Sequence, residues 1–507
     1  MENNQEKQST SSLTAENTDS PNTMATSQVT VDFAKGFGSN QFDEASGVDI
    51  DKDGNSYIAG SFRNNATFGD KNLENNSSRD DAFVAKLDKT GNVAWAQRLG
   101  GISSDAAYGI SVDESGNSYV TGTFQGEVTF RTGTPKSDEV DDAPEQPIEN
   151  GETQNDDAPE QPIDEGETSN DDDTPPTTNT EEIKFTSKGS NDAFVAKLDN
   201  QGKVQWAKQF GGTGFESGEG ITVDSQGNTF VTGSFRDTVS FGEAPALTAN
   251  GSDGFITKLD TTGKVLWANK FGGNDADEGY EVAVDKDGNS YVMGTTDVTS
   301  SSAGKLYIAK IDDAGNFAWR ETFEGTANRE GSGVAVDKAG NTYFTGHFRG
   351  TATFGDTTLT STGLNDGFIT KLDAAGNVQW AKKFGGKSND EGYGIALDES
   401  DDIYLTGSFE ENIFFGNTEL NSSGNRDQDA FIAKLDTMGK VKWAKKLGSE
   451  SPEVGYDIAV MGDSKTYVVG SFKDNATIGS ESISNAGDSD AFLVKLNEQI
   501  PEISLAV

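Results

Sequence analysis

A phrase centred on tryptophan recurs along the chain and limits the fold more than any other feature. Each of the six tryptophans lies in a phrase such as VQWAKKFGG, and these residues are Trp95, Trp206, Trp267, Trp319, Trp380 and Trp443. Most successive tryptophans are roughly 60 residues apart, which is typical of a repeat architecture. The chain is therefore expected to be an array of similar units rather than several unrelated domains.

Each repeat predicts four β-strands. After the tryptophan phrase come a Gly-rich acidic loop, a strand such as YGIALD, a strand such as NSYVTGSF, a longer loop and a strand such as DAFVAKLD. In YGIALD, Tyr393, Ile395 and Leu397 alternate with the small Gly394 and Ala396, and a period of two indicates a strand. The D-x-x-G turns between strands favour tight hairpins, so we predict an all-β fold of four-stranded antiparallel units.

The second strand of the repeat occurs more often than the tryptophan phrase. It has seven copies, which begin near Gly60, Gly122, Gly233, Gly294, Gly346, Gly407 and Gly470. The last copy lacks a tryptophan phrase, but VDFAKGFG at Val31–Gly38 has the same pattern with Phe33 in place of tryptophan. We therefore predict a seven-bladed β-propeller whose N-terminal strand, at about residues 29–38, completes the last blade and leaves no free sheet edge.

The repeated phrases also resemble a known family. DAFVAKLD, GNVQWAK and D-x-x-GN-x-YV-x-G-x-F are similar to the bacterial β-propeller repeats called SBBP repeats, over about residues 29–498. The resemblance implies a propeller fold and an extracellular or cell-surface location, and it implies no defined activity. The C-terminal PEISLAV resembles the first strand of a Calx-β domain, so residues 499–507 are expected to be a tail or the start of a further domain.

Three segments depart from the repeat. Residues 1–28 read as a disordered polar leader without a signal peptide, and residues 131–184 read as an acidic, Pro-rich insertion in blade 2 that is expected to be disordered. In the fourth copy the third loop is short, and Lys305 replaces the aspartate that opens the third strand elsewhere. That change marks either a notch on one side of the ring or ordinary repeat drift.

Charge and composition exclude several classes of function. The chain has 84 acidic and 40 basic residues, for a net charge of -44, so binding to nucleic acid or to an anionic membrane surface is not expected. It contains no cysteine, which excludes thiol catalysis and thiolate metal sites. No apolar run is long enough to span a bilayer, so we expect no membrane insertion.

Acidic residues in the loops between blades suggest a ligand face. These crossing loops share one face of the predicted ring with the long loops, and they carry Asp275, Asp277, Glu278, Asp390 and Glu391 among other acids. A negative rim around the channel would attract a cation or a cationic ligand. The alternative is that these carboxylates are solvated or cap the loop backbone.

Two D-x-x-G turns suggest calcium as a candidate cofactor. Asp49, Asp51, Asp53 and Asn55 follow the opening pattern of an EF-hand loop, and Asp285, Asp287 and Asn289 repeat part of it. Calcium needs several oxygen ligands, which this spacing can supply. The glutamate required at the twelfth position is Gly60, so an ordinary hairpin turn is the competing interpretation.

No motif identifies an enzyme. The single histidine, His347, occupies a Ser or Thr position of the repeat, which favours a structural role over a catalytic triad or a zinc site. The first hypothesis is a monomeric, non-enzymatic binding or adhesion scaffold that recognises a protein or glycan. The alternatives are an extracellular hydrolase or lyase that uses channel-rim carboxylates, and a structural spacer of a larger surface protein.

Overall fold

The fold was analysed in a computed structural model that describes residues 28–75, 77–132, 182–299, 302–325, 329–423 and 428–499. Nearly all of the predicted leader, most of the predicted insertion and nearly all of the predicted tail lie outside these residues. One boundary needs correction: Arg131 and Glu182–Lys184 are not part of a disordered insertion. They belong to the antiparallel hairpin of β10 (Glu127–Arg131) and β11 (Glu182–Thr186).

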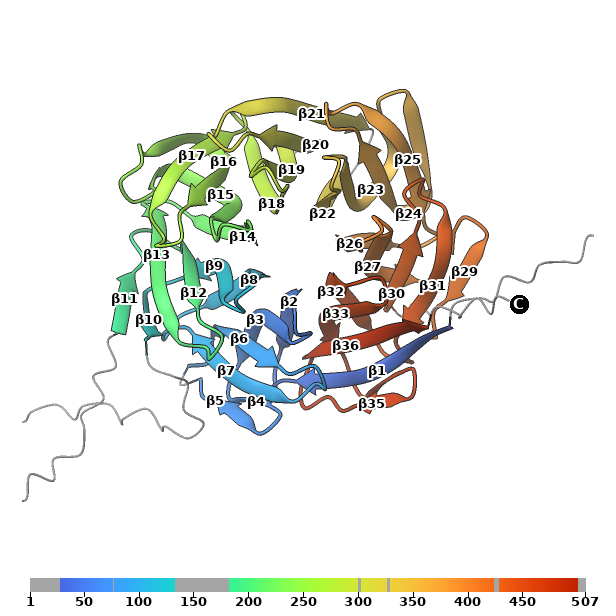
Figure 1. Cartoon of the computed structure of the whole chain (residues 1–507), viewed down its shortest axis with the longest axis horizontal. Helices are drawn as coiled ribbons and strands as arrows, with labels where there is room; N and C mark the ends of the chain where they lie inside the picture. Colours follow the sequence, from blue (N-terminus) through green and yellow to red (C-terminus); the bar gives the residue numbers. More distant parts are fainter. Residues whose placement is uncertain are drawn as a thin grey trace, which may run out of the picture.

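Every regular element in the described residues is a β-strand, and the main strands form antiparallel groups of four, here called blades and numbered in chain order. Figure 1 shows the blades around a central axis, with the first strand of each blade innermost. From the centre outward, blade 1 contains β2 (Asp43–Ile50), β3 (Ser56–Arg63), β6 (Asp80–Leu87) and β7 (Val93–Leu99). Blade 2 contains β8 (Asp105–Val112), β9 (Ser118–Phe124), β12 (Asp192–Leu198) and β13 (Val204–Gly212). Blade 3 contains β14 (Glu216–Val223), β15 (Thr229–Ser240), β16 (Leu247–Leu259) and β17 (Val265–Phe271).

The remaining blades follow the same order. Blade 4 contains β18 (Ala276–Val284), β19 (Ser290–Thr299), β20 (Ser302–Ile311) and β21 (Phe317–Gly325), and blade 5 contains β22 (Arg329–Val336), β23 (Thr342–Phe354), β24 (Thr357–Leu372) and β25 (Val378–Phe384). Blade 6 contains β26 (Asp390–Leu397), β27 (Ile403–Glu410), β30 (Gln428–Leu435) and β31 (Val441–Leu447). Blade 7 contains β32 (Glu453–Met461), β33 (Lys465–Phe472), β36 (Asp490–Gln499) and β1 (Gln28–Phe37).

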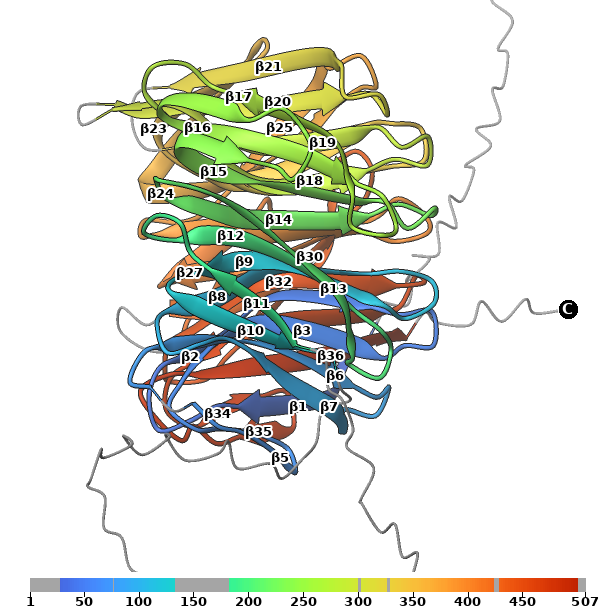
Figure 2. The same cartoon turned by 90° about the vertical axis from the view of Figure 1, so that its left-hand side faces the viewer.

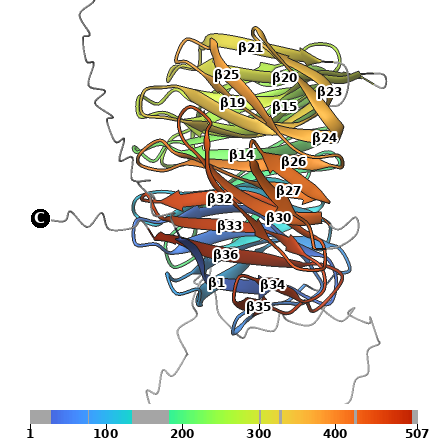
Figure 3. The ribbon, with the colours of Figure 1, turned by 90° about the vertical axis from the view of Figure 1, so that its right-hand side faces the viewer.

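Short hairpins extend three of the loops between second and third strands. They are β4 (Ala66–Phe68) with β5 (Lys71–Leu73), β28 (Asn412–Phe415) with β29 (Thr418–Asn421), and β34 (Ala476–Ile478) with β35 (Glu481–Ile483). Edge-on views show strands running between two opposite faces of the ring, with loops gathered at both (Figure 2 and Figure 3). The pairing of Asp105 with Phe124 places the crossing loop and the loop after the second strand on the same face, opposite the D-x-x-G turns.

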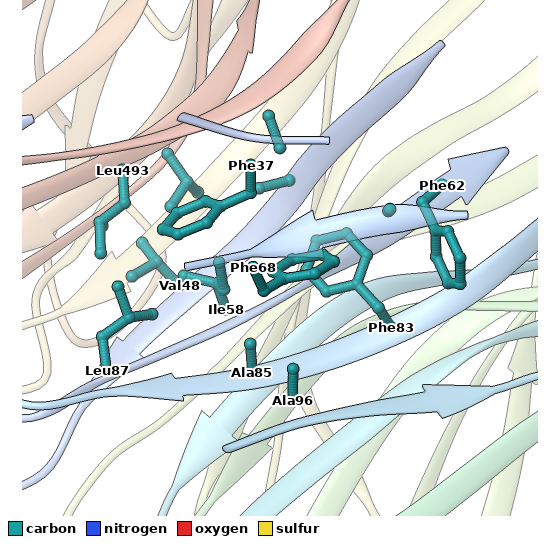
Figure 4. Close-up of a cluster of buried hydrophobic side chains, with 14 of the residues drawn as sticks. Phe37, Val48, Ile58, Phe62, Phe68, Phe83, Ala85, Leu87, Ala96 and Leu493 are labelled. Carbon is teal, nitrogen blue, oxygen red and sulfur yellow. The ribbon is translucent and has the colours of Figure 1, made fainter. Parts of the chain in front are cut away.

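The first strand in the chain belongs to the last blade. β1 pairs antiparallel with β36, and Phe33 lies opposite Lys495 just as Trp95 lies opposite Lys86 in blade 1. The hydrophobic clusters lie between neighbouring blades, because large apolar residues project from each sheet onto the next. Figure 4 shows one such cluster, in which Leu493 and Phe37 of blade 7 pack with residues of blade 1.

The D-x-x-G turns have one recurring geometry. In the turn before β7, the Asp88 carboxylate accepts hydrogen bonds from the backbone N–H groups of Thr90 and Asn92, at 2.9 and 3.0 Å. Gly91 has a φ of 84°, which a residue with a side chain adopts only at a cost. The aspartate and glycine of the repeat are therefore explained by the hairpin itself.

The innermost strands differ from the simple alternation predicted for YGIALD. The register shifts between Gly392 and Ile395, so a β-bulge interrupts this strand, and every inner strand shifts at the same place. Tyr393 and Ile395 both line the central cavity, and Ile395 also packs in a hydrophobic cluster, so the simple alternation is interrupted at the bulge. Side chains at and directly after the bulge line the channel, as Tyr280 and Glu281 show.

Candidate functional site

The carboxylates that open the inner strands are buried, and they hold the crossing loops. Asp277 accepts hydrogen bonds from the N–H groups of Gly273 and Asp297, at 2.7 and 2.8 Å, and Asp390 accepts one from Gly386 at 2.6 Å. Both aspartates are fully buried. Asp277 and Asp390, which were predicted for the ligand face, thus bind backbone N–H groups of the crossing loops, and a role in ligand binding stays a prediction.

The carboxylate that opens an inner strand and binds the crossing loop is called the clamp below. In most blades a second buried aspartate lies beside the clamp. In blade 1, Asp81 at the start of the third strand lies near Asp105, the clamp of the next crossing loop, and pairs with Arg98 Nε at 2.9 Å. Burial raises the pKa of Asp81 to about 8 and that of Asp105 to about 7, although hydrogen bonds and Arg98 oppose the shift. These pairs join neighbouring blades.

The junction between blades 4 and 5 lacks this pair. Lys305 replaces the third-strand aspartate, and its Nζ lies 3.3 Å from carboxylate oxygens of both Asp297 and Glu324. Arg329 takes the position of the clamp, because it is paired with Phe348 as Asp390 is paired with Phe409. Both acidic positions thus carry basic residues at this one junction.

The candidate calcium residues of the first turn do not converge. The Asp49 carboxylate accepts N–H groups of Ile50 and Val112, at 2.8 and 2.7 Å, and so binds the inner strand of blade 2. Asp51 folds back onto the turn and accepts the N–H groups of Asp53 and Asn55 at 3.0 Å, with the Asn55 amide at 2.7 Å. Asp53 is exposed and pairs with a lysine. These contacts fit the hairpin interpretation of the turn, and calcium binding by these residues stays a prediction.

The second candidate turn repeats this arrangement. Asp285 accepts the N–H groups of Asp287 and Asn289 at 3.0 Å, and the Tyr291 hydroxyl donates to it at 3.0 Å. Lys310 lies over the Tyr291 ring, 4.9 Å from its centroid, and 3.5 Å from Asp285. Asp287 is exposed. No group of three or more acidic, histidine or cysteine side chains in the described part of the chain is placed to hold a metal ion.

A central cavity of about 610 Å³ is lined by all the innermost strands. Its tyrosines are Tyr108, Tyr280, Tyr393 and Tyr456, and its carboxylic acids are Glu44, Asp49, Glu219, Glu281, Glu330 and Asp457. No lysine, arginine or histidine is among the described residues that line it. The cavity therefore combines carboxyl groups with aromatic surface, and both kinds of group can interact with organic cations.

Three glutamates from consecutive blades form an arc at the loop-side mouth of this channel. Glu278, Glu330 and Glu391 occupy the same position of β18, β22 and β26. Burial raises the pKa of Glu330; His347 opposes this, and the carboxylates of Glu278 and Glu391 add to it. Of the predicted ligand-face residues, Glu278 and Glu391 are brought together here, whereas Asp275 is exposed on its crossing loop.

His347 occupies space beside this arc. In blades 4 and 7 the channel tyrosine contacts the Ser or Thr position of the second strand: Tyr280 with Thr295 at 3.0 Å, and Tyr456 with Ser471 at 3.3 Å. In blade 5 the tyrosine position is Ser332 and the Ser or Thr position is His347, so the large and small residues are exchanged. The His347 Nε2 lies 3.9 Å from Oε2 of Glu330.

Sequence reasoning missed the tyrosines and the deep acids Glu219, Glu281 and Asp457. Their signal is a departure from the repeat at inward positions: Glu281 and Asp457 replace a glycine that the other copies keep. Comparing copies position by position would have found them. The bulge that turns these side chains into the channel has no comparable sequence signal.

Comparison with known proteins agrees with this architecture. The sequence model of the β-propeller repeat SBBP matches residues 94–123, 205–234, 266–300 and 379–408. The chain carries SBBP β-propeller repeats. Each matched segment begins beside a tryptophan of the recurring phrase and reaches into the second strand of the next blade. The predicted resemblance to SBBP repeats is thus confirmed, and the protein is an all-β propeller-repeat protein.

Two curated relatives match part of this SBBP-repeat chain. An uncharacterized WD repeat-containing protein of Acanthamoeba polyphaga mimivirus is 24% identical over 272 residues, 43% of this chain and 20% of that protein. The regulatory protein FlaEY of Caulobacter vibrioides is 26% identical over 195 residues, 36% of this chain and 20% of that protein. The chain thus spans about a fifth of the length of these relatives.

Sqt1 from Chaetomium thermophilum is among the solved structures to which this chain is similar. Its sequence identity is 9%, the alignment covers 93% of this chain and 100% of Sqt1, and the TM-score is 0.41. In the described part of the SBBP-repeat chain, no helix is long and apolar enough to cross a membrane.

Proposed function

We propose that this SBBP-repeat protein is a non-enzymatic interaction scaffold that binds a basic segment of a partner protein at the mouth of its central channel, outside the cell or at its surface. The observation that carries the proposal is the arc of Glu278, Glu330 and Glu391. These carboxylates come from three neighbouring blades, and Glu330 keeps 52% of its side chain exposed. Like charges held together destabilise one another, and a bound cation relieves that repulsion.

The junction beside the arc supports the same proposal. Lys305 and Arg329 replace the buried acidic pair between blades 4 and 5, so this part of the face differs chemically from the rest of the ring. Lys305 is already paired with Asp297 and Glu324, so a ligand at this face needs basic groups for the arc. A basic segment of a protein meets that requirement.

The scaffold is proposed to be a closed ring of seven blades, with β1 as the last strand of blade 7. The pairing of β1 with β36 and the packing of Phe33 and Phe37 in the interblade clusters support closure. Deletion of residues 28–38 should then expose the edge of β36 and abolish cooperative thermal unfolding. Deletion of residues 1–27 is the control. Equal melting curves for both deletions would contradict closure.

The binding proposal is tested with a labelled tetralysine peptide. The variant Glu278→Gln/Glu330→Gln/Glu391→Gln should weaken the Kd measured by fluorescence anisotropy at least tenfold. The matched control Asp53→Asn/Asp70→Asn/Asp287→Asn removes the same charge from side chains that are 66–77% exposed elsewhere. A loss of affinity that is equal in both variants would mean binding through net charge alone and would refute the proposed site.

A hydrolase or lyase is the second candidate. It is favoured by Glu219, whose pKa burial raises to about 7, so that in a tyrosine-lined cavity it could serve as a general acid. Release of reducing ends from acidic and neutral polysaccharides, abolished by Glu219→Gln, would support it. A purely structural spacer would be inactive in both the peptide and the polysaccharide assays.

A further inference from the structure

In five blades, the residue after the bulge of the inner strand is a glycine that has no room for a side chain. The residues there are Gly47, Gly109, Gly220, Gly333 and Gly394, and the inner strand of the next blade passes close to each of them. A Cβ atom on Gly109 would lie 2.7 Å from the carbonyl oxygen of the next blade's Glu219, and one on Gly333 would lie 2.6 Å from that of Tyr393. Glycine is thus required by contact between blades rather than by turn geometry.

Blades 4 and 7 carry an acidic residue in place of this glycine. Glu281 and Asp457 occupy the glycine position, and in each case the next blade carries a small serine, Ser332 or Ser46, where the other blades carry tyrosine or glutamate. At both junctions, a larger residue after the bulge thus coincides with a smaller residue on the next blade. Twice, then, an acid replaces glycine in one blade while serine replaces a large residue in the next blade. These replacements place carboxyl groups deep in the channel.

These deep carboxyls have no cationic partner in the cavity. Glu281 Oε1 accepts the N–H of Val282 at 2.9 Å, and Asp457 accepts the N–H groups of Val48 and Ile458 at 2.8 and 2.7 Å. Burial raises the pKa of Glu281 to about 8, with further repulsion from Asp457 and Glu219. Burial likewise raises the pKa of Asp457 to about 7, with repulsion from Asp49.

A buried polar atom beside the same cavity also lacks a partner. The residue His347 is 8% exposed and its Nδ1 makes no hydrogen bond. Its Nε2 faces Glu330, which lines the cavity. A buried nitrogen without a partner costs free energy unless a ligand or water satisfies it.

The remaining wall is aromatic and suits an alkyl chain. Tyr280 and Tyr456 direct their hydroxyls to Thr295 and Ser471 of their own blades, so their rings are held at the channel wall. A metal ion requires several oxygen ligands at close range, and the described residues hold no such group. Carboxyls from different blades in a cavity that also contains tyrosine rings instead match positive charges spaced along an apolar chain.

We propose that the channel binds a linear polyamine, with one ammonium group near Glu281 and another near Asp457. This ligand and site are distinct from the basic protein segment proposed for the mouth. The two sites are affected by different substitutions, so the failure of one proposal leaves the other testable.

Isothermal titration calorimetry with spermidine tests the site at pH 7. Glu281→Gln, which keeps the oxygen that accepts the Val282 N–H, should weaken the Kd at least tenfold. Asp70→Asn, with a side chain 77% exposed, is the matched control and should leave it unchanged. Equal affinity in Glu281→Gln and the unaltered protein would overturn the proposal.

Proton release gives a readout that surface binding cannot produce. A bound cation favours the ionised form of Glu281, so roughly one proton should be released per spermidine, measured from titrations in phosphate and in Tris. Exposed carboxylates are already ionised at pH 7 and release none. Binding without proton release, or the same release caused by micromolar calcium chloride, would refute a polyamine site.

Discussion

The Asp457 carboxylate accepts a hydrogen bond from the backbone N–H of Val48 at 2.8 Å, and this contact joins the last inner strand of the ring to the first. The two residues are 409 positions apart in the chain. In the next blade, Asp49 binds the N–H of Val112 in the same way at 2.7 Å. Channel carboxylates therefore join neighbouring blades as well as lining the cavity.

Asp457→Ala should destabilise the ring. The substitution leaves the Val48 and Ile458 N–H groups without their acceptor, and a buried unsatisfied donor costs about 1–3 kcal/mol. Urea unfolding followed by tryptophan fluorescence measures the loss. Asp53→Ala, on an exposed turn, is the control. An unchanged unfolding midpoint for Asp457→Ala would mean that water replaces the carboxylate without cost.

The stability of the protein should fall as the pH rises from 5 to 9. Burial raises the pKa of Asp390 and of Asp81 to about 8, so the folded protein holds these protons where the unfolded chain has lost them. Each such group lowers the free energy of unfolding by up to about 1.4 kcal/mol per pH unit in this window. The check is the urea midpoint at pH 5, 7 and 9.

Asp390→Asn should reduce this pH dependence, because the amide cannot ionise and still accepts the Gly386 N–H. Asp88→Asn is the matched control: hydrogen bonds in its turn lower the pKa of Asp88 to about 2, which lies outside the window. Stability that rises with pH in the unaltered protein would contradict the assignment of buried, protonated carboxyls.

The turn aspartates should stabilise the fold without calcium. Asp51→Asn weakens acceptance of the Asp53 and Asn55 N–H groups and the ion pair with Lys86 at 3.5 Å, so it should lose about 1–2 kcal/mol. Thermal melts in millimolar calcium and in EDTA should show the same loss. A loss confined to calcium would instead support the calcium-site hypothesis for Asp51 and Asp287.

His347 and Ser332 should be energetically coupled. His347→Ser alone creates a cavity beside Glu330, and Ser332→Tyr alone forces a ring into space that the imidazole occupies. The double substitution restores the arrangement of blades 4 and 7, so it should be more stable than the sum of the single changes by about 0.5–3 kcal/mol. Additive losses in a double-mutant cycle would show that the two positions do not share one space.

Much of the architecture was predictable because it is written in local patterns. The tryptophan phrase, the D-x-x-G turns and the VDFAKGFG phrase identify the strands, the hairpins and the partner of β36. Turn geometry depends on residues next to each other, as Asp88 and Gly91 illustrate. The burial of a side chain was not predictable from such local patterns. Asp275 and Asp277 lie two positions apart, yet Asp275 is exposed and Asp277 is buried.

The sequence by itself determined the repeat, the strand order within each blade and the acidic, cysteine-free character of the chain. Only the tertiary structure decided which carboxylates are clamps, which line the channel and which remain in solvent. The reason is that the environment of Asp277, Glu281 or Asp457 is made by a crossing loop and by the inner strand of a neighbouring blade. Those contacts depend on the bulge and on the packing of one sheet against the next, neither of which is encoded in residues adjacent along the chain.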